Sequence, residues 1–99
     1  MVVVALITVR ASALSAFRAF EAQAAQIMAR HGGAIERTLV LNPGPEDGLI
    51  KEMHWVSFPD SAAFEAYRQD RDLARFLHLR DGSVLETQLW TGEPGPTYR

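Results

Sequence analysis

Apolar and polar residues follow two different periods along the chain, and these periods predict its secondary structure. Residues 2–9 form an unbroken apolar, β-branched run, which is typical of a strand with both faces buried. Further on, large apolar residues recur every three or four positions, which predicts an amphipathic helix capped by Ser12. Gly32 and Gly33 end that helix, because glycine adopts the left-handed geometry of a helix C-terminus without a Cβ clash. The apolar positions of this helix are Leu14, Phe17, Phe20, Ala24, Ile27 and Met28.

The second half of the chain begins with a hairpin pattern. Residues 34–42 and 49–58 have strand propensity, and the sequence PGPEDG at 43–48 between them forces a turn. Residues 83–91, SVLETQLWT, predict a fourth strand near the end of the chain.

Two helical segments lie between the third and fourth predicted strands. Pro59 interrupts the strand, and Asp60 or Ser61 caps a short helix behind it. A further helical piece starts at Asp70 or Asp72, carries apolar residues at helical spacing, and stops at the pair 81–82, Asp-Gly.

The resulting order is β-α-β-β-α-β, the split βαβ arrangement of ferredoxin-like α+β domains. In this fold two helices cover one face of a four-stranded antiparallel sheet. Because no linker divides the chain, we expect a single domain over residues 1–91 and an irregular Pro/Gly-rich tail over 92–99.

The first strand is apolar on both of its faces, and this predicts a partner. A strand covered by helices on one face only should alternate apolar and polar residues, whereas Val2, Val4 and Leu6 are as apolar as their neighbours. A second sheet would cover the outer face, and twofold self-association is the commonest way to supply one. We expect a homodimer that forms through sheet-to-sheet packing.

Composition narrows the classes of function. The 99 residues include no cysteine, so disulfides, thiolate metal sites and cysteine nucleophiles are excluded. The formal charge of −2 and the scattered basic residues give no footprint for nucleic acid or for an anionic membrane. The apolar start is too short to span a bilayer, so we expect a cytoplasmic protein whose partners are small molecules or proteins.

Three stretches carry a resemblance to a known superfamily. The phrase ARHGGAIER at 29–37, the phrase HWVSFPDSAAFEAYRQD at 54–70, and Arg80 before the last strand resemble the dimeric α/β-barrel superfamily. Within it the sequence is most similar to a family of small bacterial proteins of unknown function, related to the antibiotic-biosynthesis monooxygenase and YciI-like groups. The resemblance covers nearly the whole chain, from Val2 to about Thr91.

This resemblance implies a ferredoxin-like protomer, a dimer whose two sheets face each other, and a cleft between helices and sheet in each protomer. In enzymatic relatives the cleft holds aromatic polyketide-like substrates, haem or small acids. The superfamily shares no single activity, and no set of monooxygenase catalytic residues can be transferred here position by position.

Glu52 and His54 are the strongest candidates for chemistry. They stand two apart in a strand and project from the same face, where a carboxylate can orient an imidazole and raise its basicity. The pair suits a general base, provided that it is buried. Alternatively, it is an ordinary polar pair at a dimer surface or a sheet rim.

Arg80 and His31 are candidate ligand-binding residues. Arg80 falls on the apolar side of the last helical segment, where a buried guanidinium needs an anionic partner. That partner is either a carboxylate of this chain, from Glu52, Glu86 or Asp70, or an anionic ligand. His31 shares the face of the first helix that carries its apolar residues, if the helix extends that far. It either points into the cleft or stabilises the helix C-terminus through the helix dipole.

The aromatic residues are numerous enough to line a pocket for a planar compound, with Trp55 and Tyr67 as candidate ligand contacts, although such residues also form an ordinary core. Only Glu52 and His54 have chelating spacing, and no HxH or HExxH pattern adds a second pair, so we expect no metal site. No phosphate loop, nucleophile elbow or dinucleotide fingerprint occurs, and we expect no cofactor.

Two hypotheses of different classes follow. The first is a small cofactor-independent enzyme, of monooxygenase-like or isomerase-like type, that binds an aromatic or acidic metabolite. In it His54 is the acid-base group, Glu52 orients His54, and Arg80 fixes an anion. It predicts that His54 and Arg80 open into one cavity. The second is a non-catalytic dimeric binding or interaction protein, in which the same residues make structural hydrogen bonds.

Overall fold

A computed structural model describes residues 1–41 and 47–99. Asn42 and most of the predicted turn, residues 43–46, lie outside the described residues. Four strands and four α-helices follow one another in the predicted order, with a short 3₁₀ helix over Ala11–Ala13 ahead of the first α-helix. The elements are β1 (Val2–Arg10), α1 (Leu14–Ala29), β2 (Ala34–Val40), β3 (Leu49–Ser57), α2 (Ser61–Arg68), α3 (Arg71–Ala74), α4 (Leu77–Asp81) and β4 (Val84–Gly92).

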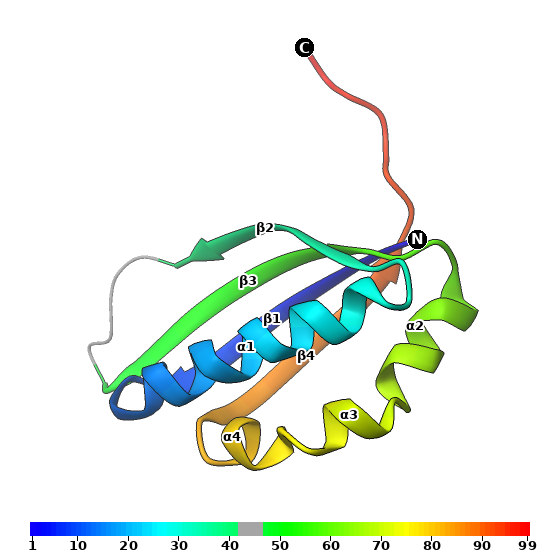
Figure 1. Cartoon of the computed structure of the whole chain (residues 1–99). Coiled ribbons are helices and arrows are strands. Elements are labelled where there is room, and N and C mark those ends of the chain that lie inside the picture. Colours follow the sequence, from blue (N-terminus) through cyan, green and yellow to red (C-terminus); the bar gives the residue numbers. More distant parts are fainter. Residues whose placement is uncertain (42–46) are drawn as a thin grey trace.

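The strands form one antiparallel sheet in the order β2-β3-β1-β4, with β1 in its interior as its apolar sequence predicts. Figure 1 shows the helices on one side of this sheet, and the chain beyond β4 extending away from the body of the molecule. The predicted ferredoxin-like α+β fold is therefore confirmed.

The register of β1 aligns polar residues of β3 and β4 beneath the helices. Ala5 of β1 lies between His54 of β3 and Leu89 of β4, and Ile7 lies between Glu52 and Thr87 in the same two strands. Because directly paired residues share a face, Glu52, His54 and Thr87 all belong to the helix-covered side of the sheet.

The helix starts and ends differ in part from the sequence predictions. Ser12 lies exposed in the 3₁₀ helix, and α1 begins at Leu14 without a side-chain cap, so the predicted Ser12 cap is wrong. Asp60 does cap α2, since its Oδ1 accepts a hydrogen bond from the Ala63 backbone N–H at 2.8 Å. The last helical segment is two short helices, α3 and α4, and Asp70 caps the first of them.

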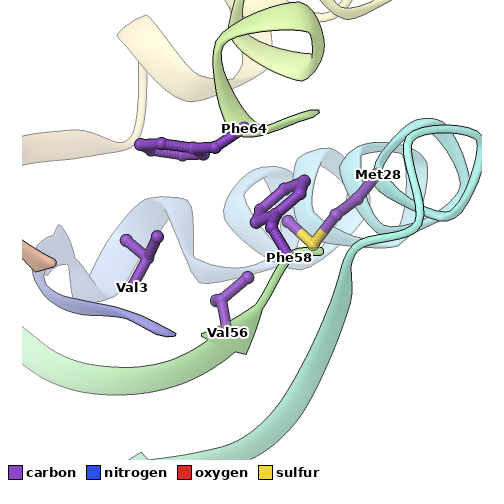
Figure 2. Close-up of a cluster of buried hydrophobic side chains, with 5 residues drawn as sticks. All are labelled: Val3, Met28, Val56, Phe58 and Phe64. Atoms are coloured by element: carbon purple, nitrogen blue, oxygen red, sulfur yellow. The ribbon is translucent and has the colours of Figure 1, made fainter. Parts of the chain in front are cut away.

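The core nearest the junction of α1 and β2 combines side chains from the sheet and from two helices. Figure 2 shows Val3 and Val56 on the sheet, Met28 on α1, Phe64 on α2, and Phe58 between them. Gly33 is buried at this junction, where an added Cβ would lie closer to the Phe58 ring and the Met28 side chain than van der Waals contact allows. Glycine is required there for lack of space.

None of the described helices lies on the opposite side of the sheet (Figure 1). The pairing of Val4 with Trp55 and Trp90, and of Leu6 with Met53, places these side chains together on that side. Trp55 and Trp90 are 39% and 54% exposed. We call this surface the outer face; its apolar residues are Val4, Leu6, Leu39, Met53, Trp55 and Trp90. Within the described part of the chain, no helix has the length and apolar content needed to cross a bilayer.

Candidate functional site

A cavity of about 310 Å³ lies between the helices and the sheet. Its walls are mostly apolar, and its aromatic residues come from α1, α2 and the chain just after β3: Phe17, Phe20, Phe58, Phe64 and Tyr67. Two of these walls, Phe58 and Phe64, are drawn in Figure 2. The polar groups that reach the cavity are Glu21, His54, Arg68, Arg80 and Thr87. His54 and Arg80 thus line one cavity, as the enzyme hypothesis requires.

His54 sits on the sheet side of the cavity and is held by Glu52. The two side chains are 3% and 2% exposed, and His54 Nε2 lies 2.9 Å from Glu52 Oε1. The other Glu52 oxygen accepts a hydrogen bond from Arg18 of α1, and the Phe17 ring packs beside the imidazole with ring centres 6.2 Å apart. The Glu52 and His54 pair predicted from its spacing is therefore formed, and it is buried.

The hydrogen bonds of Glu52 determine which nitrogen of His54 is available. An ionised carboxylate accepts hydrogen bonds and cannot donate them, so Nε2 carries the proton in the bond to Glu52. In the neutral ring Nδ1 then keeps a lone pair. Nδ1 lies 3.7 Å from Glu21 Oε2, on the side of the ring that faces α1 and the cavity. Nε2 thus fixes the orientation of the His54 ring, and Nδ1 is the nitrogen that can react with a ligand.

Glu21 is the site residue that the sequence predictions missed. It lies on α1 four positions after Phe17, so its side chain shares the inward face of the helix, and its side chain is only 20% exposed. Burial raises the pKa of Glu21 above the ordinary value of 4.5; His54 opposes that rise, Glu52 adds to it, and Arg80 and Arg18 oppose it. A carboxylate within the apolar stripe of an amphipathic helix is the sequence signal that marks this residue.

Arg80 of α4 reaches the cavity with its guanidinium bonded to a neutral partner. Its Nη2 donates a hydrogen bond to Thr87 Oγ1 of β4 at 2.7 Å. Glu52, Glu86 and Asp70, the carboxylates considered from the sequence, form no ion pair with it, and neither does any other carboxylate among the described residues. The positive charge of Arg80 is therefore available to an anion in the cavity.

Tyr67 and Trp55, the two aromatic candidates, lie on different sides of the sheet. Tyr67 of α2 lines the cavity, and burial, with Glu21 nearby, raises its pKa to about 12, so its hydroxyl stays protonated at neutral pH. Trp55 belongs to the outer face and does not line the cavity. The structure therefore keeps Tyr67 as a candidate ligand contact in the cavity and places Trp55 away from it.

His31 joins the end of α1 to the start of α3 and does not line the cavity. Its Nε2 lies 2.7 Å from Asp70 Oδ2, and the neighbouring Arg30 donates to Asp72 Oδ2 at 2.8 Å. This hydrogen bond from His31 is the principal reason that the pKa of Asp70 is lowered. His31 therefore makes a contact between α1 and α3, and it does not point into the cavity as a ligand contact.

The described residues contain no group of three or more histidine and acidic side chains placed to hold a metal ion. The polar groups of the cavity are instead those of an acid-base and anion-binding site: an oriented imidazole, a carboxyl, a phenol and a guanidinium.

Comparison with known proteins gives matches at the level of structure. No protein-family model matches the sequence, and no curated protein matches it. SnoaB, a cofactor-independent oxygenase from Streptomyces nogalater, superposes with a TM-score of 0.63 over 95% of this chain and 93% of its own, at 20% identity. The chain has the same fold.

Two further solved structures support the same relationship. An antibiotic biosynthesis monooxygenase matches with a TM-score of 0.66 at 12% identity, over 97% of this chain and 100% of its own. An uncharacterized NIPSNAP domain protein from Burkholderia xenovorans matches with a TM-score of 0.69 at 12% identity, over 98% of each chain. These structural neighbours have the ferredoxin-like fold that the sequence resemblance implies.

Proposed function

We propose that this protein binds a small aromatic acid in the cavity and that His54 removes a proton from it. The observation that carries the proposal is that a buried His54, oriented by Glu52, shares one cavity with Arg80, whose guanidinium bonds Thr87 alone among residues 1–41 and 47–99. A base and an anion-binding group in one apolar cavity are the parts that such a reaction needs.

The cavity walls support the aromatic acid as ligand class. Ligand pockets have volumes of about 300–1,000 Å³, so this cavity is at the small end and suits a compound of one or two rings. Aromatic side chains favour a planar apolar ligand. The fork of Arg80 matches a carboxylate, and the protonated Tyr67 hydroxyl offers a donor to a ligand oxygen.

The position of His54 supports its role as base. Its Nδ1 takes the proton, and the imidazolium that results lies between two carboxyl groups, Glu52 at 2.9 Å and Glu21 at 3.7 Å. Both stabilise the positive charge that forms in a site with little water. The step requires no cofactor, and one structural neighbour is a cofactor-independent oxygenase. Removal of a proton begins either an oxygenation or an isomerisation of the ligand.

The outer face supports a second part of the proposal, that the protein is a homodimer. Two tryptophans and several aliphatic side chains lie together there without a covering helix, and a contiguous apolar patch of this kind marks an interaction surface. A twofold axis places two such faces against each other, so that the sheets cover one another's apolar residues.

A ligand screen tests the binding proposal. The purified protein is heated with aromatic acids, quinones, haem and divalent metals, and its melting temperature is measured. A ligand at about 100 times its dissociation constant stabilises the fold by roughly 2.7 kcal/mol, which raises the melting temperature of a domain of this size by several degrees. We expect an aromatic acid to give this rise, and we expect His54→Ala and Arg80→Ala to abolish it.

Arg71→Ala is the matched control, since Arg71 is exposed on α3 and does not line the cavity. A rise that survives in Arg80→Ala would place the ligand elsewhere. A dimer that responds to no compound would instead favour the non-catalytic interaction protein.

A further inference from the structure

We propose that Glu21 is a second acid-base group that works beside His54, and that the reaction is the movement of a proton within an aromatic 2-oxo acid, between its keto and enol forms. The inference rests on the proposed function and gives it a reaction class. In this reaction Glu21 contacts the ligand directly and is a catalytic residue.

The geometry places Glu21 and His54 side by side on the wall of the same cavity. Glu21 projects from α1 and His54 from β3, and both line the cavity. Their nearest atoms, Oε2 and Nδ1, are 3.7 Å apart, which is too long for a direct hydrogen bond. A ligand or a water molecule that enters the cavity can therefore contact both groups.

Glu21 has few structural partners that would explain its inward position. Among residues 1–41 and 47–99 it receives no hydrogen bond, and His54 is its only ion-pair neighbour. Glu52, by contrast, is bonded to both Arg18 and His54. A largely buried carboxyl that receives no hydrogen bond lowers the stability of the fold. Contact with a ligand would explain why the Glu21 side chain points inward.

The charges around Glu21 come from every element that packs against it. His54 and Glu52 face it from β3, Arg80 from α4, and Arg18 lies one turn before it on α1; the Tyr67 hydroxyl faces it from α2. Burial outweighs the cations and raises the pKa of the Glu21 carboxyl. That direction suits a group that donates a proton near neutral pH and takes it back.

The proton and electron balance is complete without an oxidant. His54 Nδ1 takes a proton from the carbon next to the ketone, and the electron pair of that C–H bond becomes the C=C bond of the enol. The carbonyl π electrons move to oxygen, which takes the proton of the Glu21 carboxyl. The protein is left with an imidazolium beside a carboxylate, and one proton passing from Nδ1 to Glu21 restores both groups.

Arg80 selects the acid within this class. A carboxylate next to the ketone is held by the guanidinium while the aromatic ring lies against the apolar walls, so the reacting carbon lies between ring and ketone. Phenylpyruvate has this arrangement of groups, and it is the probe for the test.

The experiment follows phenylpyruvate in two ways: the disappearance of its enol by ultraviolet absorbance, and the replacement of its C3 protons by deuterium in heavy water by NMR. We expect the protein to accelerate both. Because general acid catalysis contributes about 10²–10⁴-fold, Glu21→Gln should lower kcat about 100-fold with little change in KM. Glu21→Asp should restore part of the rate. Glu93→Gln, in the exposed tail, is the control and should match the unaltered protein.

Two results would overturn the inference. One is that the unaltered protein does not accelerate either process; the other is that Glu21→Gln is as active as the unaltered protein. The proposed function is judged separately by melting temperature. If phenylpyruvate stabilises the protein but not Arg80→Ala, ligand binding in the cavity stands although the reaction class fails.

Discussion

Glu52 and Glu21 are two neighbouring carboxyls with different hydrogen-bond partners. Glu52 is 2% exposed, yet Arg18 and His54 hydrogen-bond its two oxygens, so its charge is compensated. Glu21 faces the same imidazole across a longer gap and lacks a donor of its own among the described residues. Glu52 thus orients His54, whereas the Glu21 carboxyl remains available to a ligand.

The raised pKa of Glu21 predicts a stability change with pH. The folded protein binds this proton more tightly than the unfolded chain does, so the contribution of Glu21 to stability is present below pH 4.5 and is lost as the pH rises through the raised pKa. Glu21→Gln removes this titration. We expect the variant to melt at a higher temperature than the unaltered protein at neutral pH, by a margin that shrinks toward pH 4.5. Melting curves over a pH series measure this; a margin independent of pH would contradict it.

At the scale of elements, the cavity depends on how α1 is fixed at its C-terminal end. Gly32 leaves α1 with a φ of 74°, in the left-handed region, and Gly33 then passes directly over Phe58. Next to this turn, His31 and Arg30 tie α1 to the acidic start of α3. Of the helices that cover the cavity, α1 and α3 therefore contact each other as well as packing on the sheet side.

Gly33→Ala tests the close contact at this junction. The added methyl group would overlap the Phe58 ring and the Met28 side chain, which belong to the core cluster of Figure 2. Overpacking of a core costs about 1–3 kcal/mol, so we expect a lower urea midpoint with an unchanged slope. Gly92→Ala is the control, because an added Cβ there meets no atom. Equal loss in both variants would contradict the overlap at Gly33, because the lower unfolded-state entropy of alanine by itself stabilises the fold.

At the scale of the whole molecule, the two faces of the sheet carry different kinds of side chain. The helix-covered face contributes Glu52, His54 and Thr87 to the site, whereas the outer face presents mainly apolar side chains to its surroundings. Leaving that patch in water would forfeit apolar burial worth roughly 25 cal/mol for each Å². In the proposed homodimer, a second copy of the chain would cover this patch with the same residues.

The homodimer is tested by placing a charge on the outer face. We expect light scattering to give the unaltered protein twice the protomer mass of 11.0 kDa. Trp90 is 54% exposed in the protomer, so Trp90→Glu should leave the fold intact and bury an unpaired charge only in the dimer. We expect this variant to be monomeric, and Ala22→Glu, on the exposed side of α1, to remain a dimer. A monomeric unaltered protein would refute the proposal.

Local sequence patterns were sufficient for the fold but less reliable for helix ends. An apolar run, strand propensity and turn residues placed the strands, and apolar spacing placed α1, because a residue's side of a helix depends only on its position along it. The Ser12 cap failed because a 3₁₀ helix intervenes between β1 and α1. The break between α3 and α4 was also missed, since the apolar spacing continues across it.

By itself the sequence determined the order of the elements, the buried central strand and the shared face of Glu52 and His54, all of which follow from periods of two and of three to four residues. Only the tertiary structure decided what those residues meet. Arg18 reaches Glu52 and Glu21 reaches His54 from a helix more than thirty positions earlier. Arg80 of α4 bonds Thr87 of β4, and His31 is held by Asp70 outside the cavity. Such contacts depend on how helices pack across the sheet, and that packing is fixed by the complementary shapes of distant segments, which local patterns do not encode.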